Sequence, residues 1–135
     1  MRRGARVYAV IATICVAGTA QVTKGKSRLA LTKQIMGGLV RPNCAALGKG
    51  TEKAPKDDKG WAALATNAAL LNEAGHLLMD DGRCPDGDWA DAAKTLRECS
   101  AAVLEAIENK DAEGAQGAFK AMTKACGACH KAHKK

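Results

Sequence analysis

The chain has 135 residues, enough for one domain, and carries a formal net charge of +7 with only 3% aromatic residues. The positive charge is uneven, because residues 21–51 contain six basic side chains and no acidic one, whereas the chain after residue 51 is slightly acidic. Nucleic-acid binding would favour an extended basic surface with interleaved aromatic side chains. The composition therefore argues against a nucleic-acid partner, and we interpret the basic N-terminal element as a solvated face.

Residues 1–20, MRRGARVYAVIATICVAGTA, have the organisation of a secretory signal peptide. Three arginines precede an apolar stretch at residues 7–18, and small residues follow it. The apolar stretch is shorter than the roughly 20 residues of a membrane-spanning helix. We therefore expect cleavage after Ala20, export to the periplasm and a mature domain of residues 21–135 without a membrane span. An uncleaved membrane anchor is the alternative.

Apolar residues recur at helical spacings of three and four in four segments, and no alternation typical of strands is present. The first segment runs from about residue 26 to 47 and is interrupted by Gly37, Gly38 and Pro42, which predict a bend. Its apolar stripe consists of Leu29, Met36, Val40, Cys44 and Leu47. A polar linker at residues 48–60 separates it from the second segment.

The remaining segments run from about 59 to 80, from 88 to 109 and from 111 to 134, with Asp88 as the predicted N-cap of the third. Their apolar stripes are Trp61, Leu64, Ala68, Leu71, Gly75 and Leu78; then Trp89, Ala92, Leu96, Cys99, Val103 and Ile107; then Ala115, Phe119, Met122, Cys126, Cys129 and His133. Short connections make consecutive helices antiparallel neighbours. The sequence thus predicts an all-α, up-down-up-down four-helix bundle.

The fourth segment ends in Cys126-Gly127-Ala128-Cys129-His130. Residues at i, i+3 and i+4 of a helix share a face, so the two thiols and the imidazole converge. C-x-x-C-H is the attachment sequence of c-type haem, in which the thiols bond to the vinyl groups and the histidine binds the iron. The small residues between the cysteines leave room for a flat macrocycle.

Two other interpretations of these residues compete with haem. A structural zinc site needs four ligands, and Cys126 and Cys129 with either His130 or His133 supply only three. A thioredoxin-like dithiol opens a helix, where the N-terminus lowers the thiol pKa. This motif instead closes the last helix, where the dipole opposes a thiolate. The spacing therefore favours one covalently attached haem c.

The stretch AFKAMTKACGACHKAHKK closing a four-helix bundle resembles the class II cytochromes c, the cytochrome c prime family. The resemblance covers the layout of the mature chain and is specific at Cys126, Cys129 and His130. It implies a monohaem protein with the haem near the C-terminus of the last helix, redox partner proteins, and frequent dimerisation. Ala132 and His133 stand where the family often has an aromatic–arginine pair.

The resemblance also implies that the sixth iron ligand decides the function. High-spin relatives leave that position open and bind nitric oxide or carbon monoxide, whereas low-spin relatives fill it with a methionine of the first helix and transfer electrons. Met36 is the matching candidate here, with core filling as its other interpretation. Cys84 lies in a loop at the predicted haem end and is a further candidate ligand. We expect electron transfer, with gas binding as the alternative.

No acid–base pair accompanies the motif, so we expect no enzymatic activity. Cys99 is expected in the core, and Cys44 is expected on an apolar stripe away from the haem end. His76 and His133 are expected at the surface. The basic side chains of the first segment are expected to be solvated rather than paired with haem propionates. The resemblance also implies a homodimer or a hetero-partner. Repulsion between two copies of the basic first segment opposes a symmetric dimer, and acidic residues elsewhere, such as Glu73, Asp80 and Asp81, would have to compensate.

Overall fold

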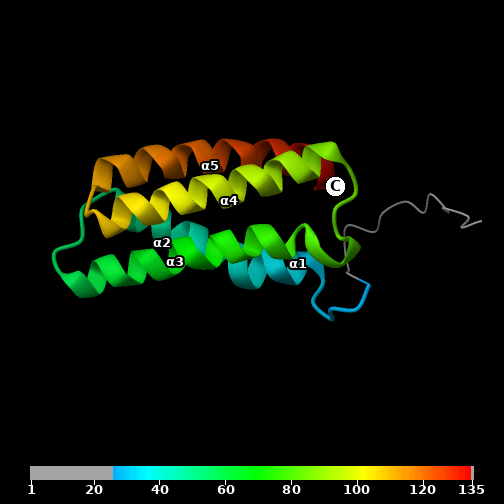
Figure 1. The fold of residues 1–135 in the computed structure, drawn as a ribbon, viewed down its shortest axis with the longest axis horizontal. Coiled ribbons are helices and arrows are strands. Elements are labelled where there is room, and N and C mark those ends of the chain that lie inside the picture. The colour runs from blue at the N-terminus through cyan, green and yellow to red at the C-terminus, as the bar shows by residue number, and fades with distance from the viewer. Residues whose placement is uncertain (1–25, 135) are drawn as a thin grey trace, which may run out of the picture.

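The computed structural model describes residues 26–134 and contains no strand among them. Its elements are α1 (Thr32–Ile35), the π-helical turn η1 (Met36–Val40), α2 (Arg41–Thr51), α3 (Asp58–Leu77), the 3-10 turn η2 (Asp80–Gly82), α4 (Gly87–Glu108) and α5 (Ala112–His133). Because α1, η1 and α2 are continuous, four long helical segments result, and they pack as a bundle (Figure 1). The all-α bundle is thus confirmed. The expected signal peptide lies outside the described residues.

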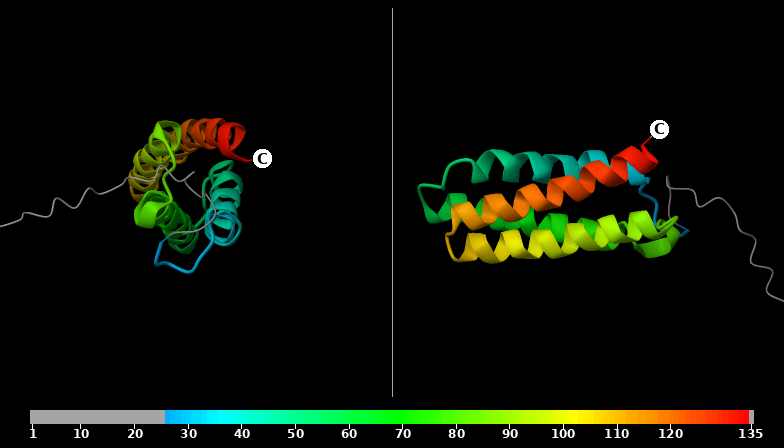
Figure 2. Two further views of the ribbon diagram at one scale, coloured as in Figure 1. Left: turned by 90° about the vertical axis from the view of Figure 1, so that its right-hand side faces the viewer. Right: turned by 90° about the horizontal axis from the view of Figure 1, so that it is seen from above.

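The helix α4 packs along both α3 and α5, and α2 packs on α3 and α5, so the helices surround a common core (Figure 2). The expected stripes of α3, α4 and α5 form the core. Fully buried members include Leu71, Val103, Ile107 and Met122, together with Leu47 from α2. None of the helices described is long and apolar enough to cross a membrane.

Small residues let the helices approach one another closely. An ideal Cβ on Gly75 in α3 would lie 2.5 Å from Cγ of Arg97 and 3.2 Å from the carbonyl oxygen of Ala93, both in α4. The alanines Ala68, Ala74, Ala93 and Ala115 are buried beside the large side chains. The alanine-rich sequence is therefore used for close helix packing.

Aspartates begin three of the helices. Asp57, Asp86 and Asp111 each accept a hydrogen bond from the backbone N–H three residues later, which satisfies one free donor of α3, α4 and α5. The expectation of Asp88 as the cap of α4 is wrong by two residues, because Asp86 takes that place. Asp88 instead lies in the first helical turn, where its charge favours the helix dipole.

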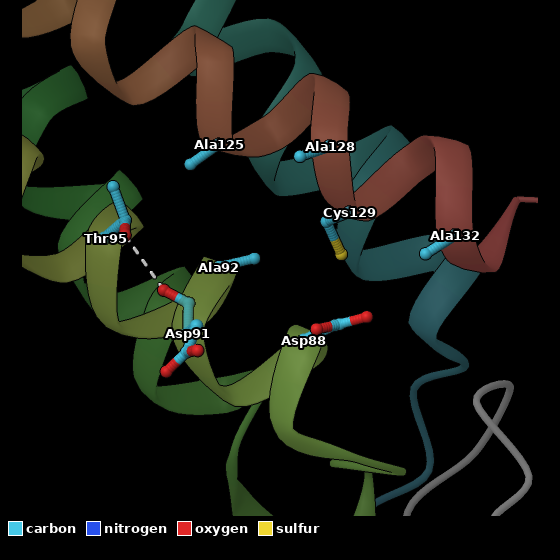
Figure 3. A pocket seen from close by; sticks show the side chains of 8 residues that line it. All are labelled: Asp88, Asp91, Ala92, Thr95, Ala125, Ala128, Cys129 and Ala132. Carbon is cyan, nitrogen blue, oxygen red and sulfur yellow. Dashed lines mark hydrogen bonds between the residues drawn. The ribbon is translucent and has the colours of Figure 1, made fainter.

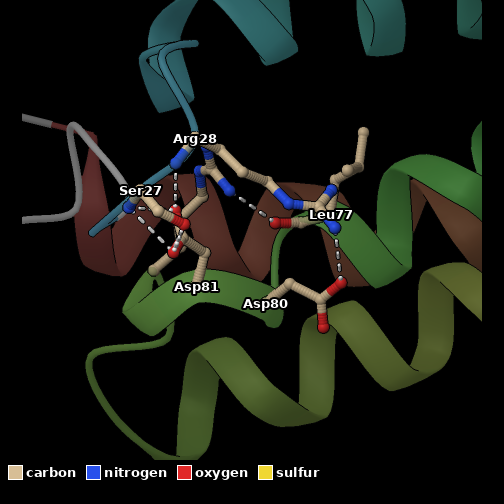
Figure 4. A network of polar contacts seen from close by, with 6 residues as sticks. Ser27, Arg28, Leu77, Asp80 and Asp81 are labelled. Atoms are coloured by element: carbon tan, nitrogen blue, oxygen red, sulfur yellow. Dashed lines mark hydrogen bonds and ion pairs between the residues drawn. The ribbon is translucent and has the colours of Figure 1, made fainter.

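The first helix begins later than expected. Residues 26–31 form a non-helical strap, and Leu29, expected on the apolar stripe, is 85% exposed. The carboxylate of Asp81 accepts hydrogen bonds from the backbone N–H groups of Ser27 and Arg28, at 2.8–3.0 Å, and from the Ser27 hydroxyl (Figure 4). These bonds hold the backbone of Ser27 and Arg28 against Asp81 in a non-helical conformation, which accounts for the later start of the helix.

The interruption expected at the glycine pair is a π-helical turn. The N–H of Arg41 donates to the carbonyl of Met36, five residues back. Pro42 has no N–H to offer the carbonyl of Gly38, so a regular α-helical pattern cannot be completed there. The side chain of Asn43 donates to the carbonyl of Leu39 at 2.6 Å and stabilises the altered turn. Such turns are rare and recur at functional sites.

Candidate functional site

The C-x-x-C-H residues occupy the last turns of α5. Cys126 and Cys129 are half-buried and pack against the core, whereas His130 is exposed. The spacing predicted that the three side chains converge on one face, but His130 is exposed while both thiols pack against the core. The two thiols face the bundle and the imidazole stays accessible to a ligand from outside it.

Both thiols of the motif are held in the protonated form. Burial raises the pKa of Cys126 to about 11, and the neighbouring thiols of Cys44 and Cys129 contribute in the same direction. Burial also raises the pKa of Cys129, with the carboxylates of Asp86 and Asp88 adding to it. A redox dithiol needs the opposite, a lowered pKa and a ready thiolate. The electrostatics therefore disfavour the thioredoxin-like interpretation.

Two of the other cysteines, Cys44 and Cys99, lie near the thiol of Cys126. Cys44, Cys84 and Cys99 are half-buried against the same core, and all of the described cysteines are free thiols. Cys44 was expected away from the haem end, but its thiol lies close enough to Cys126 to raise the pKa of that thiol. The expectation failed because α2 packs directly on α5. Among residues 26–134, no three His, Cys, Asp or Glu side chains are arranged to hold a metal ion.

The glycine pair of η1 faces solvent. The turn η1 packs on α3 and α2, and at most isolated contacts join it to α5. Gly37 and Gly38 are exposed, and an ideal Cβ on either would meet no atom within 4 Å. Met36, the first residue of the turn, is half-buried and packs against the core. The glycine pair therefore lies at the surface of the bundle, where no neighbouring atom would obstruct an approaching group.

A groove of about 350 Å³ runs between α4 and α5 beside Cys129 (Figure 3). Four alanines line it, with two carboxylates and a threonine: Ala92, Ala125, Ala128, Ala132, Asp88, Asp91 and Thr95. The thiol of Cys129 is thus reachable from the side of α4. A flat apolar group bonded to that sulfur would meet small side chains here.

His133 is not at the surface, as the sequence analysis expected, but is packed at the end of the bundle. Its side chain is 13% exposed and contacts the indole of Trp89 edge-on. Its Nε2 lies 3.4 Å from a carboxylate oxygen of Asp86 without making a hydrogen bond. The expectation failed because the helical stripe of α5 continues inward as far as this residue. His76 is exposed, as expected.

Arg83 is a residue of this region that the sequence did not reveal. It is 1% exposed, and its guanidinium donates to the backbone carbonyls of Ala30 at 2.9 Å and Leu77 at 3.4 Å. Its Nε has no partner. The surrounding loop sequence DDGRCPDGD is polar and contains no apolar stripe, so no pattern marks this arginine as buried.

The described residues fit a covalently attached haem in three respects. Cys126, Cys129 and His130 supply the donor set of the attachment motif. The groove beside Cys129 is lined mainly by four alanines, with the carboxylates of Asp88 and Asp91 at its α4 side. Buried polar atoms without partners lie near the same end of the bundle. No protein-family profile, curated protein or solved structure matches this chain.

Proposed function

We propose that this protein is an exported monohaem c-type cytochrome of the periplasm that transfers electrons through one haem attached to Cys126 and Cys129, with His130 as iron ligand. The observation that carries the proposal is the last part of α5, where two half-buried thiols stand next to an exposed imidazole at the C-x-x-C-H spacing. The proposal includes the antiparallel up-down-up-down arrangement. It is supported by the contact between Trp89, near the start of α4, and His133, at the end of α5.

The residues of the chain have separate tasks in this proposal. The sulfurs of Cys126 and Cys129 fix the cofactor covalently, so that it is not lost after export. The imidazole of His130 binds from the solvent side. The core between α3, α4 and α5 limits water at the inner face. When bound, the haem supplies the one-electron iron chemistry, which the protein tunes by axial ligation and burial.

The second candidate function is the binding of nitric oxide or carbon monoxide at an open iron position. Met36 packs against the apolar core, which is also where a methionine that only fills space would lie. If Met36 does not bind iron, the sixth position is open or is filled by Cys84. The thiol of Cys84 contacts the carbonyl oxygen of Asp86 at 3.3 Å, at the same end of the bundle.

The attachment proposal is tested by the intact mass of the full chain expressed with a cytochrome maturation system. The mature protein should exceed its polypeptide mass by one haem, and the double variant Cys126→Ala/Cys129→Ala should not. Cys99→Ala is the matched control, because it removes a half-buried thiol of the same core outside the motif. A purified protein that carries zinc and no haem would overturn the proposal.

The two candidate functions are separated by absorption spectra of the oxidised and reduced protein with and without carbon monoxide. In an electron carrier with Met36 as ligand, Met36→Ala makes the haem high-spin and open to carbon monoxide. If Cys84 is the ligand, Cys84→Ser changes the spectrum and Met36→Ala does not. Unchanged Soret bands in both variants would favour the gas-binding function. Self-association remains a prediction, which light scattering across a dilution series tests.

A further inference from the structure

Arg83 is a charged side chain buried without a carboxylate partner. Within residues 26–134, no acidic oxygen lies within 4.0 Å of its guanidinium, which instead contacts two neutral carbonyls and leaves Nε free. Arginine is almost never fully buried unless it is paired, because removing the charge from water is costly. Its position at 1% exposure therefore calls for an anion that the described residues do not supply.

The carboxylates of Asp80 and Asp81, near Arg83 in sequence, bind other residues. The carboxylate of Asp81 accepts from the strap, and the backbone N–H of Arg28 is the largest cause that lowers its pKa. The charge of Arg83 is only the smallest of these causes. Asp80 forms an exposed ion pair with Arg28 at 3.7 Å. Both acids therefore bind the strap at residues 26–31 (Figure 4), and neither forms an ion pair with Arg83 within 4.0 Å.

Two further buried polar atoms lack partners, and both belong to the same end of the bundle. They are the hydroxyl of Thr32, at the start of α1, and Nε2 of His133, at the end of α5, which makes no hydrogen bond but already has the carboxylate of Asp86 3.4 Å away. With Nε of Arg83, these are all of the buried side-chain nitrogen and oxygen atoms without a hydrogen bond in the described part of the chain. Arginine only donates, while a hydroxyl and an imidazole can donate. The group that suits Arg83 is an acceptor with negative charge, and a carboxylate pairs with arginine bidentately.

We propose that Arg83 is a carboxylate-binding group and that its ligand is a propionate of the covalently attached haem. The proposal rests on the function proposed above, since the C-x-x-C-H motif holds the cofactor at this end of the bundle. The backbone carbonyl of Ala30 now occupies one Nη of Arg83, so an incoming carboxylate competes with the strap for the guanidinium.

The test compares Arg83→Met in the haem-loaded protein with the same substitution in a haem-free chain carrying Cys126→Ser and Cys129→Ser. Haem attachment is verified first by intact mass, so that failure of the proposed function is recognised separately. In the haem-free chain, Arg83→Met should leave the unfolding temperature unchanged or raise it, because it removes a buried unpaired charge. In the haem-loaded protein it should lower both the unfolding temperature and the reduction potential, since a nearby positive charge favours ferrous iron.

Two further variants keep the test decisive. Arg83→Lys keeps the charge and should retain most of the reduction potential, which also covers the case in which Arg83→Met does not fold. Arg97→Met is the matched control, because Arg97 is a half-buried arginine held by a backbone carbonyl, that of Gly75, in the middle of the bundle. It should change the unfolding temperature equally with and without haem, and leave the potential unchanged. An equal effect of Arg83→Met on both forms, with an unchanged potential, overturns the proposal.

A free carboxylate is the other source of the same chemistry. Sodium propionate added to the haem-free chain should stabilise it more than sodium chloride at equal ionic strength, and Arg83→Met should abolish the difference. If sodium propionate stabilises the haem-free chain but Arg83→Met changes neither the stability nor the potential of the haem-loaded protein, a carboxylate site exists. The assignment of that site to haem is then overturned. If propionate does not stabilise the haem-free chain and Arg83→Met does not affect the haem-loaded protein, Arg83 binds no carboxylate and the whole proposal fails.

Discussion

The imidazole of His133 stands edge-on against the indole of Trp89, with ring centroids 5.3 Å apart and planes at 77°. The indole Nε1 in turn donates a 2.7 Å hydrogen bond to the carbonyl of Leu78 at the end of α3. One aromatic contact and one hydrogen bond therefore join the last turn of α5 to α4 and α3. His130 lies only three residues before His133, so this junction also supports the helical turn that carries the proposed iron ligand.

Replacing Trp89 with alanine should lower the free energy of unfolding of the haem-free chain by about 3–5 kcal/mol, because a buried indole and its hydrogen bond are lost. Urea unfolding followed by circular dichroism measures the change. Trp61→Ala is the control, since Trp61 is only half-buried and its loss should cost less. An equal cost for the two substitutions would show that the junction at Trp89 contributes nothing special to stability.

The close approach of α3 and α4 predicts opposite effects for two glycines. Gly75→Ala places a methyl group against Cγ of Arg97 and the backbone of Ala93 and should destabilise the protein by about 1–3 kcal/mol. Gly117→Ala, at an exposed position of α5 with no atom near an ideal Cβ, should stabilise it by about 0.5–1 kcal/mol. Thermal unfolding of the two variants side by side checks the sign. Stabilisation by Gly75→Ala would mean that the helices separate easily.

The bond between Asp81 and the strap should depend on pH. Hydrogen bonding to Arg28 and Ser27 holds the pKa of Asp81 below its ordinary value of 3.8. The contribution of the carboxylate is therefore complete above that ordinary value and is lost as the pH falls through the lowered pKa of the folded state. Hydrogen exchange of a strap peptide, corrected for the intrinsic pH dependence of exchange, should accelerate over that acidic range.

Asp81→Asn should produce the same acceleration already at neutral pH. The substitution removes the charge and keeps a residue that tolerates the positive φ of 61° at this position. Asp58→Asn is the control, because Asp58 also has a lowered pKa but is paired with Lys110 away from the strap. Strap exchange that is unaffected by Asp81→Asn would show that other contacts hold residues 26–31.

The raised pKa of Cys126 predicts slow alkylation of the haem-free chain. With a pKa of about 11 instead of 9.0, the thiolate fraction at pH 8 falls by about 100-fold, and the thiolate is the reactive form. Peptide mapping after iodoacetamide treatment should find Cys126 modified far more slowly in the folded chain than in urea. Equal rates in the two states would show that Cys126 is neither buried nor held as a thiol.

The sequence predicted the bundle because the stripes of α3, α4 and α5 are regular. The residues Leu64, Leu71, Leu96, Val103 and Met122 are buried as their spacing required. The attachment motif was also evident, because its spacing is local to one turn. Features that depend on contacts between distant segments were not predictable. Burial of Arg83 requires Ala30 and Leu77 to meet around it, and neither neighbour is marked in the sequence.

The errors in the first helical segment have a similar cause. A helix beginning near residue 26 was expected from Leu29 and Met36, but the carboxylate of Asp81, more than fifty residues away, fixes the strap instead. His133 was placed at the surface because its partner Trp89 belongs to another helix. Cys44 was placed away from the motif because its distance from α5 depends on how the two helices are aligned along each other. The sequence of one segment does not contain that information.

The π-helical turn amounts to a one-residue insertion in an otherwise regular helix. Deletion of Gly38 from the chain would let the segment close as an α-helix and rotate every residue before it by about 100° around the axis. Thr32 and Ile35, both 6% exposed, would then turn away from the core, and the strap would leave the carbonyl of Ala30 out of line with Arg83. The rotational orientation of the whole N-terminal segment about its helix axis therefore depends on one inserted residue.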